Sequence, residues 1–157
     1  MTTETITHNL TNKEVEDTLR SVIQSLIDGQ QGFLSISEHL KDETLRRYFA
    51  GESLKRAEFR GDLEEILHLE GVHDVKEKGT VGGAIHRTWG DIKAHLGGED
   101  HSLLETAEAG EDAAKKAYEE ALENRLPLPI KQLLDSQYVH ILASHDYVKA
   151  ARDSRKS

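Results

Sequence analysis

Apolar residues recur at helical spacing in four long segments of the chain, with charged and polar residues between them. In the first segment Leu19, Val22 and Leu26 fall on one side of a helix, because residues three or four positions apart share a face. No segment shows the strict alternation of apolar and polar residues that is typical of a half-buried strand. The pattern therefore predicts an all-α protein, with helices over residues of about 13–40, 44–70, 101–125 and 129–152.

The lengths of the connections predict how these helices pack. Residues 41–43 join the first two predicted helices, and a turn at Pro127 joins the last two. Helices of similar length joined by such short turns form antiparallel hairpins. The glycine-rich residues 71–100 lie between the hairpins and contain one shorter amphipathic segment, a crossover helix at about 82–96. Two hairpins joined by one long crossover give a ferritin-like antiparallel four-helix bundle, in which the second and third long helices run parallel. Flexible tails are expected at residues 1–12 and 153–157.

Charge and composition narrow the range of partners. The 157 residues include 20 Lys or Arg and 29 Asp or Glu, a formal charge of −9 without a basic cluster. This balance disfavours nucleic acid, whose binding needs a positive surface to displace counterions. No apolar run approaches the roughly 20 residues of a membrane span, and the first residues do not resemble a signal peptide. We therefore expect a cytoplasmic protein with no nucleic-acid or membrane partner; the absence of cysteine also excludes disulfides and thiolate metal sites.

Seven polar residues interrupt the apolar faces near the middle of the predicted helices, at heights that allow them to meet in one layer. They are Gln30, Glu52, Arg56, Glu108, Glu111, Gln137 and His145. One interpretation is a structural network, in which Arg56 pairs with Glu111 or Glu108 and the other members complete the hydrogen bonds. A buried charge needs such a partner. Under this interpretation the layer fixes the register of the helices, and no cofactor is expected.

The same layer also permits a metal site. Di-iron bundles take Glu from two helices and Glu-x-x-His from the other two, and carboxylate oxygens and imidazole suit iron or manganese. The candidate ligands are Glu108, Glu111, His145 and Glu58. The motif is incomplete, because Gln137 precedes His140 where a glutamate is needed, and Arg56 puts a positive charge where a cation would lie.

Several short segments together carry a resemblance to a known group of proteins. These segments are 28–33 (DGQQGF), 56–59 (RAEF), 83–89 (GAIHRTW), 110–112 (GED), 118–122 (YEEAL) and 145–146 (HD). With them, residues from about 13 to 150 resemble a bacterial family of short ferritin-like four-helix proteins of unassigned function, often found among stress-associated genes. More distantly the chain is similar to rubrerythrin-like di-iron proteins, whose third helix carries a Glu-x-x-Glu like that of Glu108 and Glu111. The resemblance implies a ferritin-like fold and no established activity.

Three classes of function stay open on the sequence. The leading hypothesis is a ferritin-like bundle that is not an enzyme and has no complete di-iron site. It would act in stress physiology by self-association, for example as a homodimer, or by binding a protein partner. The alternative is an iron- or manganese-binding oxidase or storage protein that uses a degenerate carboxylate and histidine site in the bundle core. A sensor that binds a metal or small molecule in the core is the third class.

Overall fold

Four α-helices make up nearly all of the part of the chain that the structure, a computed structural model, describes: residues 12–69 and 99–155. They are α2 (Asn12–His39), α3 (Glu43–Leu69), α6 (Asp100–Leu122) and α7 (Leu128–Asp153). No strand occurs within the described residues. The prediction of an all-α four-helix bundle is confirmed, and each helix begins and ends within three residues of its predicted bounds. The predicted crossover helix at 82–96 lies outside the described residues, as do residues 1–11 and 156–157 of the two predicted tails. Asn12 and Asp153, which were predicted to lie in the tails, belong to α2 and α7.

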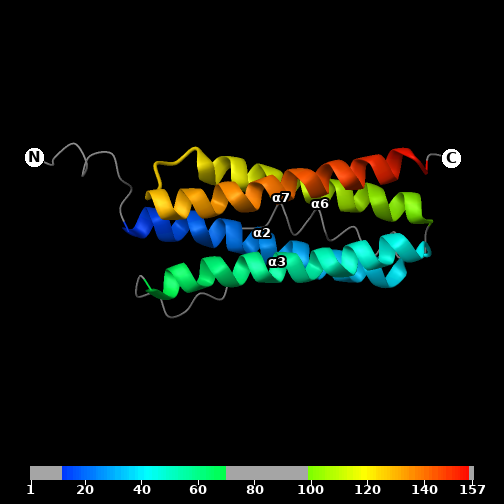
Figure 1. The fold of residues 1–157 in the computed structure, drawn as a ribbon, viewed down its shortest axis with the longest axis horizontal. Helices are drawn as coiled ribbons and strands as arrows, with labels where there is room; N and C mark the ends of the chain where they lie inside the picture. Colours follow the sequence, from blue (N-terminus) through cyan, green and yellow to red (C-terminus); the bar gives the residue numbers. More distant parts are fainter. Residues whose placement is uncertain (1–11, 70–98, 156–157) are drawn as a thin grey trace, which may run out of the picture.

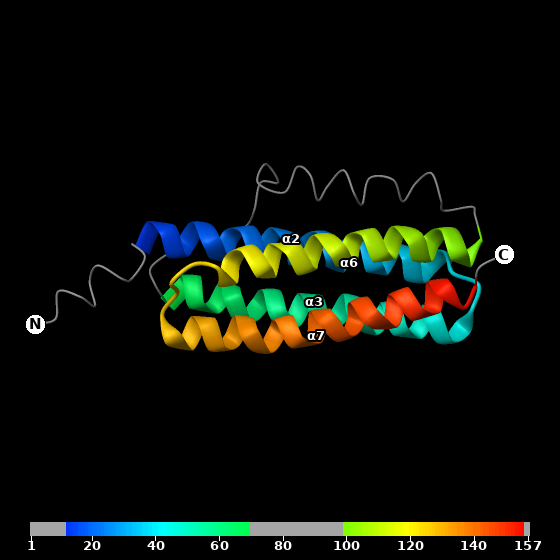
Figure 2. The same ribbon diagram turned by 90° about the horizontal axis from the view of Figure 1, so that it is seen from above.

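The helices form two hairpins, α2 with α3 and α6 with α7 (Figure 1). The backbone N–H groups of Lys41 and Asp42, in the turn before α3, donate to the Asp100 carboxylate at 2.8 and 2.9 Å. At the same end Arg155, just after α7, donates from Nη2 to Oδ2 of Asp42 at 2.6 Å. Helices α3 and α6 therefore start at one end of the bundle and run parallel, as expected for two hairpins joined by a crossover; Figure 2 shows α2 beside α6 and α3 beside α7.

Local signals explain where α3 and α7 begin. Oδ1 of Asp42 accepts the N–H of Leu45 at 2.9 Å, which satisfies one of the free donors at the start of a helix. Pro129 stands in the first turn of α7, where a missing N–H costs nothing. None of the described helices combines the length and the apolar character that crossing a membrane would require.

The apolar core is divided into two clusters. One cluster includes Leu19, Leu26, Leu63, Tyr118, Leu134 and Ile141. The other includes Phe33, Ile36, Phe49, Leu104 and Val148. On α3, α6 and α7 the residues between these clusters include buried polar ones, Arg56, Glu111 and Ser144 respectively. A polar layer therefore crosses the bundle near the middle of its helices.

Candidate functional site

Arg56 lies at the centre of this polar layer and is fully buried. Its Nε donates to Oε2 of Glu52, one turn earlier on α3, at 2.8 Å, and its Nη2 donates to Oε1 of Glu111 on α6 at 2.6 Å. The guanidinium also lies over the ring of Phe33 on α2, 4.7 Å from the ring centroid. Hydrogen bonds in which both partners are charged are the strongest ordinary ones. Arg56 therefore links three of the four helices.

Helix α7 completes the layer, because it supplies side chains that contact the carboxylates of Glu52 and Glu111. Nε2 of His140 lies 2.9 Å from Oε2 of Glu52. The hydroxyl of Ser144 donates to Oε2 of Glu111, and Oγ of Ser144 accepts the hydroxyl of Tyr48 at 2.7 Å. Both oxygens of Glu111 are thus engaged within the protein, one by Arg56 and one by Ser144.

The electrostatics of the layer follow from burial and from these contacts. Burial alone would lower the pKa of Arg56, but the charges of Glu111 and Glu52 hold that pKa above its ordinary value. Burial would likewise raise the pKa of Glu52, but the hydrogen bond with His140 and the charge of Arg56 lower it overall. Burial raises the pKa of Glu111, and Arg56 and Ser144 offset only part of that effect. Arg56 stays protonated, so the centre of the bundle holds a permanent positive charge.

The other expected members of the network lie away from Arg56. Gln30 is partly buried and its Oε1 accepts from Nη1 of Arg60 at 3.1 Å. Gln137 is buried and its Oε1 accepts the hydroxyl of Tyr118 at 2.8 Å. Glu108 pairs with Arg152, and Nε2 of His145 lies 2.8 Å from Oδ1 of Asp112. The structure therefore joins Glu52, Arg56 and Glu111 in one network and distributes Gln30, Gln137, Glu108 and His145 over separate contacts.

The predicted set of metal ligands is not brought together. Glu111 is turned to Arg56 and Ser144, and Glu58 is 62% exposed and pairs with Lys55 at 2.9 Å. A di-metal centre also needs net negative charge from its protein ligands, whereas the guanidinium of Arg56 carries a positive charge at that level. The residues of the layer do not fit a di-iron or di-manganese centre.

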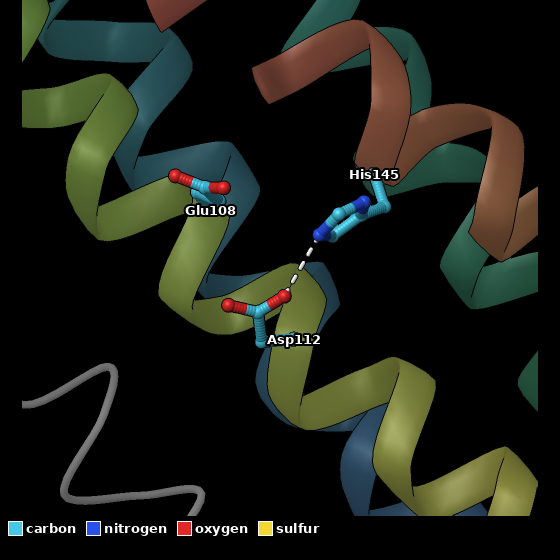
Figure 3. Close-up of side chains that lie close together, drawn as sticks. All are labelled: Glu108, Asp112 and His145. Carbon is cyan, nitrogen blue, oxygen red and sulfur yellow. Dashed lines mark hydrogen bonds and ion pairs between the residues drawn. The ribbon is translucent and has the colours of Figure 1, made fainter.

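Two of the four predicted ligands do meet, on the flank between α6 and α7. Glu108 and Asp112 stand one turn apart on α6, and His145 faces them from α7 (Figure 3). One ligand atom of each lies within 4.8 Å of the other two. Asp112 was absent from the predicted set, although its position four residues after Glu108 places both on one face of a helix.

Sequence reasoning also missed three members of the core network: His140, Ser144 and Tyr48. A signal existed for two of them on α7. Ser144 falls four residues before Val148 and three after Ile141, so it belongs to the apolar face. His140 precedes Ile141 and lies on the flank of the same face. A short polar residue on an apolar face does not by itself predict a contact with a charged group, because such residues also occur there without a charged partner.

Comparison with known families assigns the chain to a family for which no activity is described. Residues 14–124 match a family described as Domain of unknown function (DUF2383). The chain belongs to this family. No protein with a curated description matches the chain.

The part of the chain that matches DUF2383 contains α3, α6 and all of α2 from residue 14 onward, and therefore Glu52, Arg56 and Glu111. It ends before α7, which supplies His140, Ser144 and His145. The expected membership in a family of unassigned function is confirmed. The ferritin-like affiliation stays a prediction, because the DUF2383 description states neither a fold nor a function.

Proposed function

We propose that this DUF2383 protein is a non-enzymatic four-helix bundle that acts by self-association. Its core polar layer keeps the helices in register and does not hold a di-metal centre. The observation that carries the structural role of the layer is the pairing of buried Arg56 with Glu52 and Glu111, and the observation that carries self-association is the set of exposed apolar side chains on α3 and α7. The cytoplasmic location and the role in stress physiology that the sequence and its resemblance imply are part of the same proposal.

The pairing of Arg56 with Glu52 and Glu111 supports a structural role for the layer, because a metal ion that bound there would have to displace the guanidinium. A cation that used Glu52 or Glu111 would compete with Arg56 for that carboxylate, and its binding would leave the buried guanidinium with only one of its two partners. Breaking a buried ion pair in this way costs about 3–5 kcal/mol. Iron oxidation in the core is the rival function, and binding of the iron would have to offset that free-energy cost.

Exposed apolar side chains support one particular layer of helices as the contact face. The large hydrophobic residues that are exposed in the described part of the chain are Leu34, Leu54, Leu69, Leu128, Val139 and Tyr147. All but Leu34 belong to α3 or α7, which lie side by side in the bundle (Figure 2). Leu54 on α3 is 73% exposed and Val139 on α7 is 66% exposed. Burial of such side chains against another surface is favourable by about 25 cal/mol per Å².

The distribution of charge favours the same face. Helices α3 and α7 together contain eight Lys or Arg and nine Asp or Glu, whereas α2 and α6 contain four and twelve. Two copies of this acidic chain repel each other, and the repulsion is weakest where acidic and basic residues balance. We therefore assign the contact with a second copy to α3 and α7.

The proposal is tested by measuring the mass of the protein in solution by light scattering after gel filtration. We expect the wild-type protein to form a dimer, and the double variant Leu54→Glu/Val139→Glu to be a folded monomer. The matched control is Leu34→Glu, which adds a charge at a 47% exposed leucine on α2 and should leave the dimer intact. A monomeric wild-type protein, or dissociation by the control variant to the same extent, would contradict the proposal.

A further inference from the structure

The side chains of Glu108, Asp112 and His145 on the flank of the bundle are not used by the core layer or by the α3 and α7 face. Their ligand atoms lie within 4.8 Å of one another, which is close enough for all three to bind one ion (Figure 3). Glu108 and His145 are largely buried, and Asp112 is exposed to solvent. Two ligands are thus held by the helix packing, and the third leaves the site open.

We propose that Glu108, Asp112 and His145 form a mononuclear binding site for a divalent transition-metal ion, of which zinc(II) is the representative. The chemistry of the donors supports this class of ion. Two carboxylate oxygens and one imidazole nitrogen form a mixed set that suits zinc, manganese or iron, whereas calcium and magnesium prefer oxygen alone. Three protein ligands and water in the remaining positions give the open arrangement usual for zinc bound at an accessible site.

The orientation of His145 supports a ligand role. Its Nε2 points at Asp112, 2.8 Å from Oδ1, and its Nδ1 lies 3.3 Å from Oδ1 of Asp146. A histidine that binds a metal through one ring nitrogen commonly donates its other N–H to a carboxylate, which fixes the tautomer and orients the ring. Asp146 is in position to accept that hydrogen bond while Nε2 binds the ion.

Arg152 is the group that competes with a metal ion for this site. Its Nη1 donates to Oε1 of Glu108, and its Nη2 donates to Oδ1 of Asp153 at 2.8 Å. A bound cation must share or replace the contact with Glu108. Because Asp153 offers Arg152 a second partner, the guanidinium keeps a hydrogen bond when Glu108 turns to the ion. Removal of the Arg152 charge should therefore strengthen metal binding.

The test is a calorimetric titration of the full-length, untagged protein with zinc chloride. We expect one ion per chain at this site. Asp112→Asn and His145→Ala should each weaken binding at least about tenfold, the lower limit seen even for partners outside the coordination shell. The matched controls are Asp135→Asn and His39→Ala, which change a half-buried aspartate on α7 and an exposed histidine on α2. Both controls should bind as the wild-type protein does.

The Arg152→Ala variant tests the proposed site independently, because it leaves all three proposed ligands in place. It should bind zinc several-fold more tightly than the wild-type protein. The far-ultraviolet circular dichroism of each variant shows whether it is folded. The site is ruled out if the wild-type protein does not bind zinc, if Asp112→Asn and His145→Ala bind it unchanged, or if Arg152→Ala does not bind it more tightly.

Discussion

At the scale of single residues, the bundle depends on how the charge of Arg56 is neutralised. Its guanidinium is fully buried and contacts two carboxylates from different helices. Such an ion pair adds little stability relative to a well-packed apolar core, but loss of one partner leaves an uncompensated charge. Under the proposed function, the layer constrains which helices can meet and at what height.

Replacement of Arg56 by alanine should be strongly destabilising. Arg56→Ala removes the guanidinium from two buried carboxylates and leaves Glu111 without a counter-charge, so we expect the free energy of unfolding to fall by about 3–5 kcal/mol. Urea denaturation followed by circular dichroism measures this change.

The control for this prediction is Arg60→Ala, one turn later on α3. Arg60 pairs with Glu64 at 3.0 Å and both side chains are partly exposed. Ion pairs of this kind contribute about 0–1 kcal/mol, so the control should lose no more than that. If Arg56→Ala and Arg60→Ala lower the free energy of unfolding equally, the ion pairs of Arg56 are no more important to stability than a surface ion pair, which would contradict the prediction.

The contacts of individual residues were predictable only in part. Arg56 and Glu111 were expected to pair, because both interrupt an apolar face at mid-helix. The sequence left Glu108 as an equal partner, since positions three apart differ by only about 60° around a helix. The rotation of α6 about its axis decides between them, and that rotation depends on the packing of the whole core. Gln30 is turned by about 100° from Gly29, and this takes it to the flank, where Arg60 lies.

At the scale of the helices, Gly29 of α2 lies directly against the polar layer. A Cβ atom at this position would lie 3.5 Å from Nη1 and 3.8 Å from Cγ of Arg56, and 3.8 Å from Cε2 of Phe33. These are ordinary van der Waals distances, so one methyl group fits but a larger side chain does not. Gly29 therefore lies against a side chain of α3 and against a ring of α2 itself.

Gly29→Ala should stabilise the protein and Gly29→Leu should destabilise it. Alanine gains up to about 1 kcal/mol from its higher helix propensity, whereas leucine must displace the guanidinium of Arg56 from its carboxylates. Thermal and urea unfolding of both variants measure the two effects.

Gly51 on α3 supplies the control, because nothing lies within 4 Å of an added Cβ there. Both Gly51→Ala and Gly51→Leu should gain stability from helix propensity alone. If Gly29→Ala loses stability, or if leucine is tolerated equally at both positions, the described packing of Arg56 on α2 is wrong.

The helices themselves were predictable because their apolar period is long and regular. The ends of α2, α3 and α7 were predicted to within one residue, and only the end of α6 differs by three. There the sequence continues with Glu123, Asn124 and Arg125, which extend a helical pattern although the helix has ended. Polar residues at the exposed end of a helix do not indicate where the helix ends, because they stay in contact with solvent whether the last turn is helical or not.

At the scale of the whole molecule, the layer formed by α2 and α6 and the layer formed by α3 and α7 have different surfaces. The excess of acidic over basic residues is concentrated on α2 and α6, and the exposed large hydrophobic residues lie mainly on α3 and α7. The pairing of the helices follows from short turns and was predictable, as was the parallel direction of α3 and α6. The asymmetry of the surface was not, because it depends on which helices become neighbours.

We infer that the ion pairs of Arg56 with Glu52 and Glu111 exclude a di-metal centre from the bundle core. The iron content of untagged protein after aerobic incubation with ferrous iron tests this claim. The Asp112→Asn variant is the appropriate sample, since it removes the proposed site on the flank. We predict no stoichiometric iron and an unchanged melting temperature. About two iron atoms per chain, the content of a di-iron bundle, with loss of that iron in a further Glu111→Gln variant, would contradict the claim.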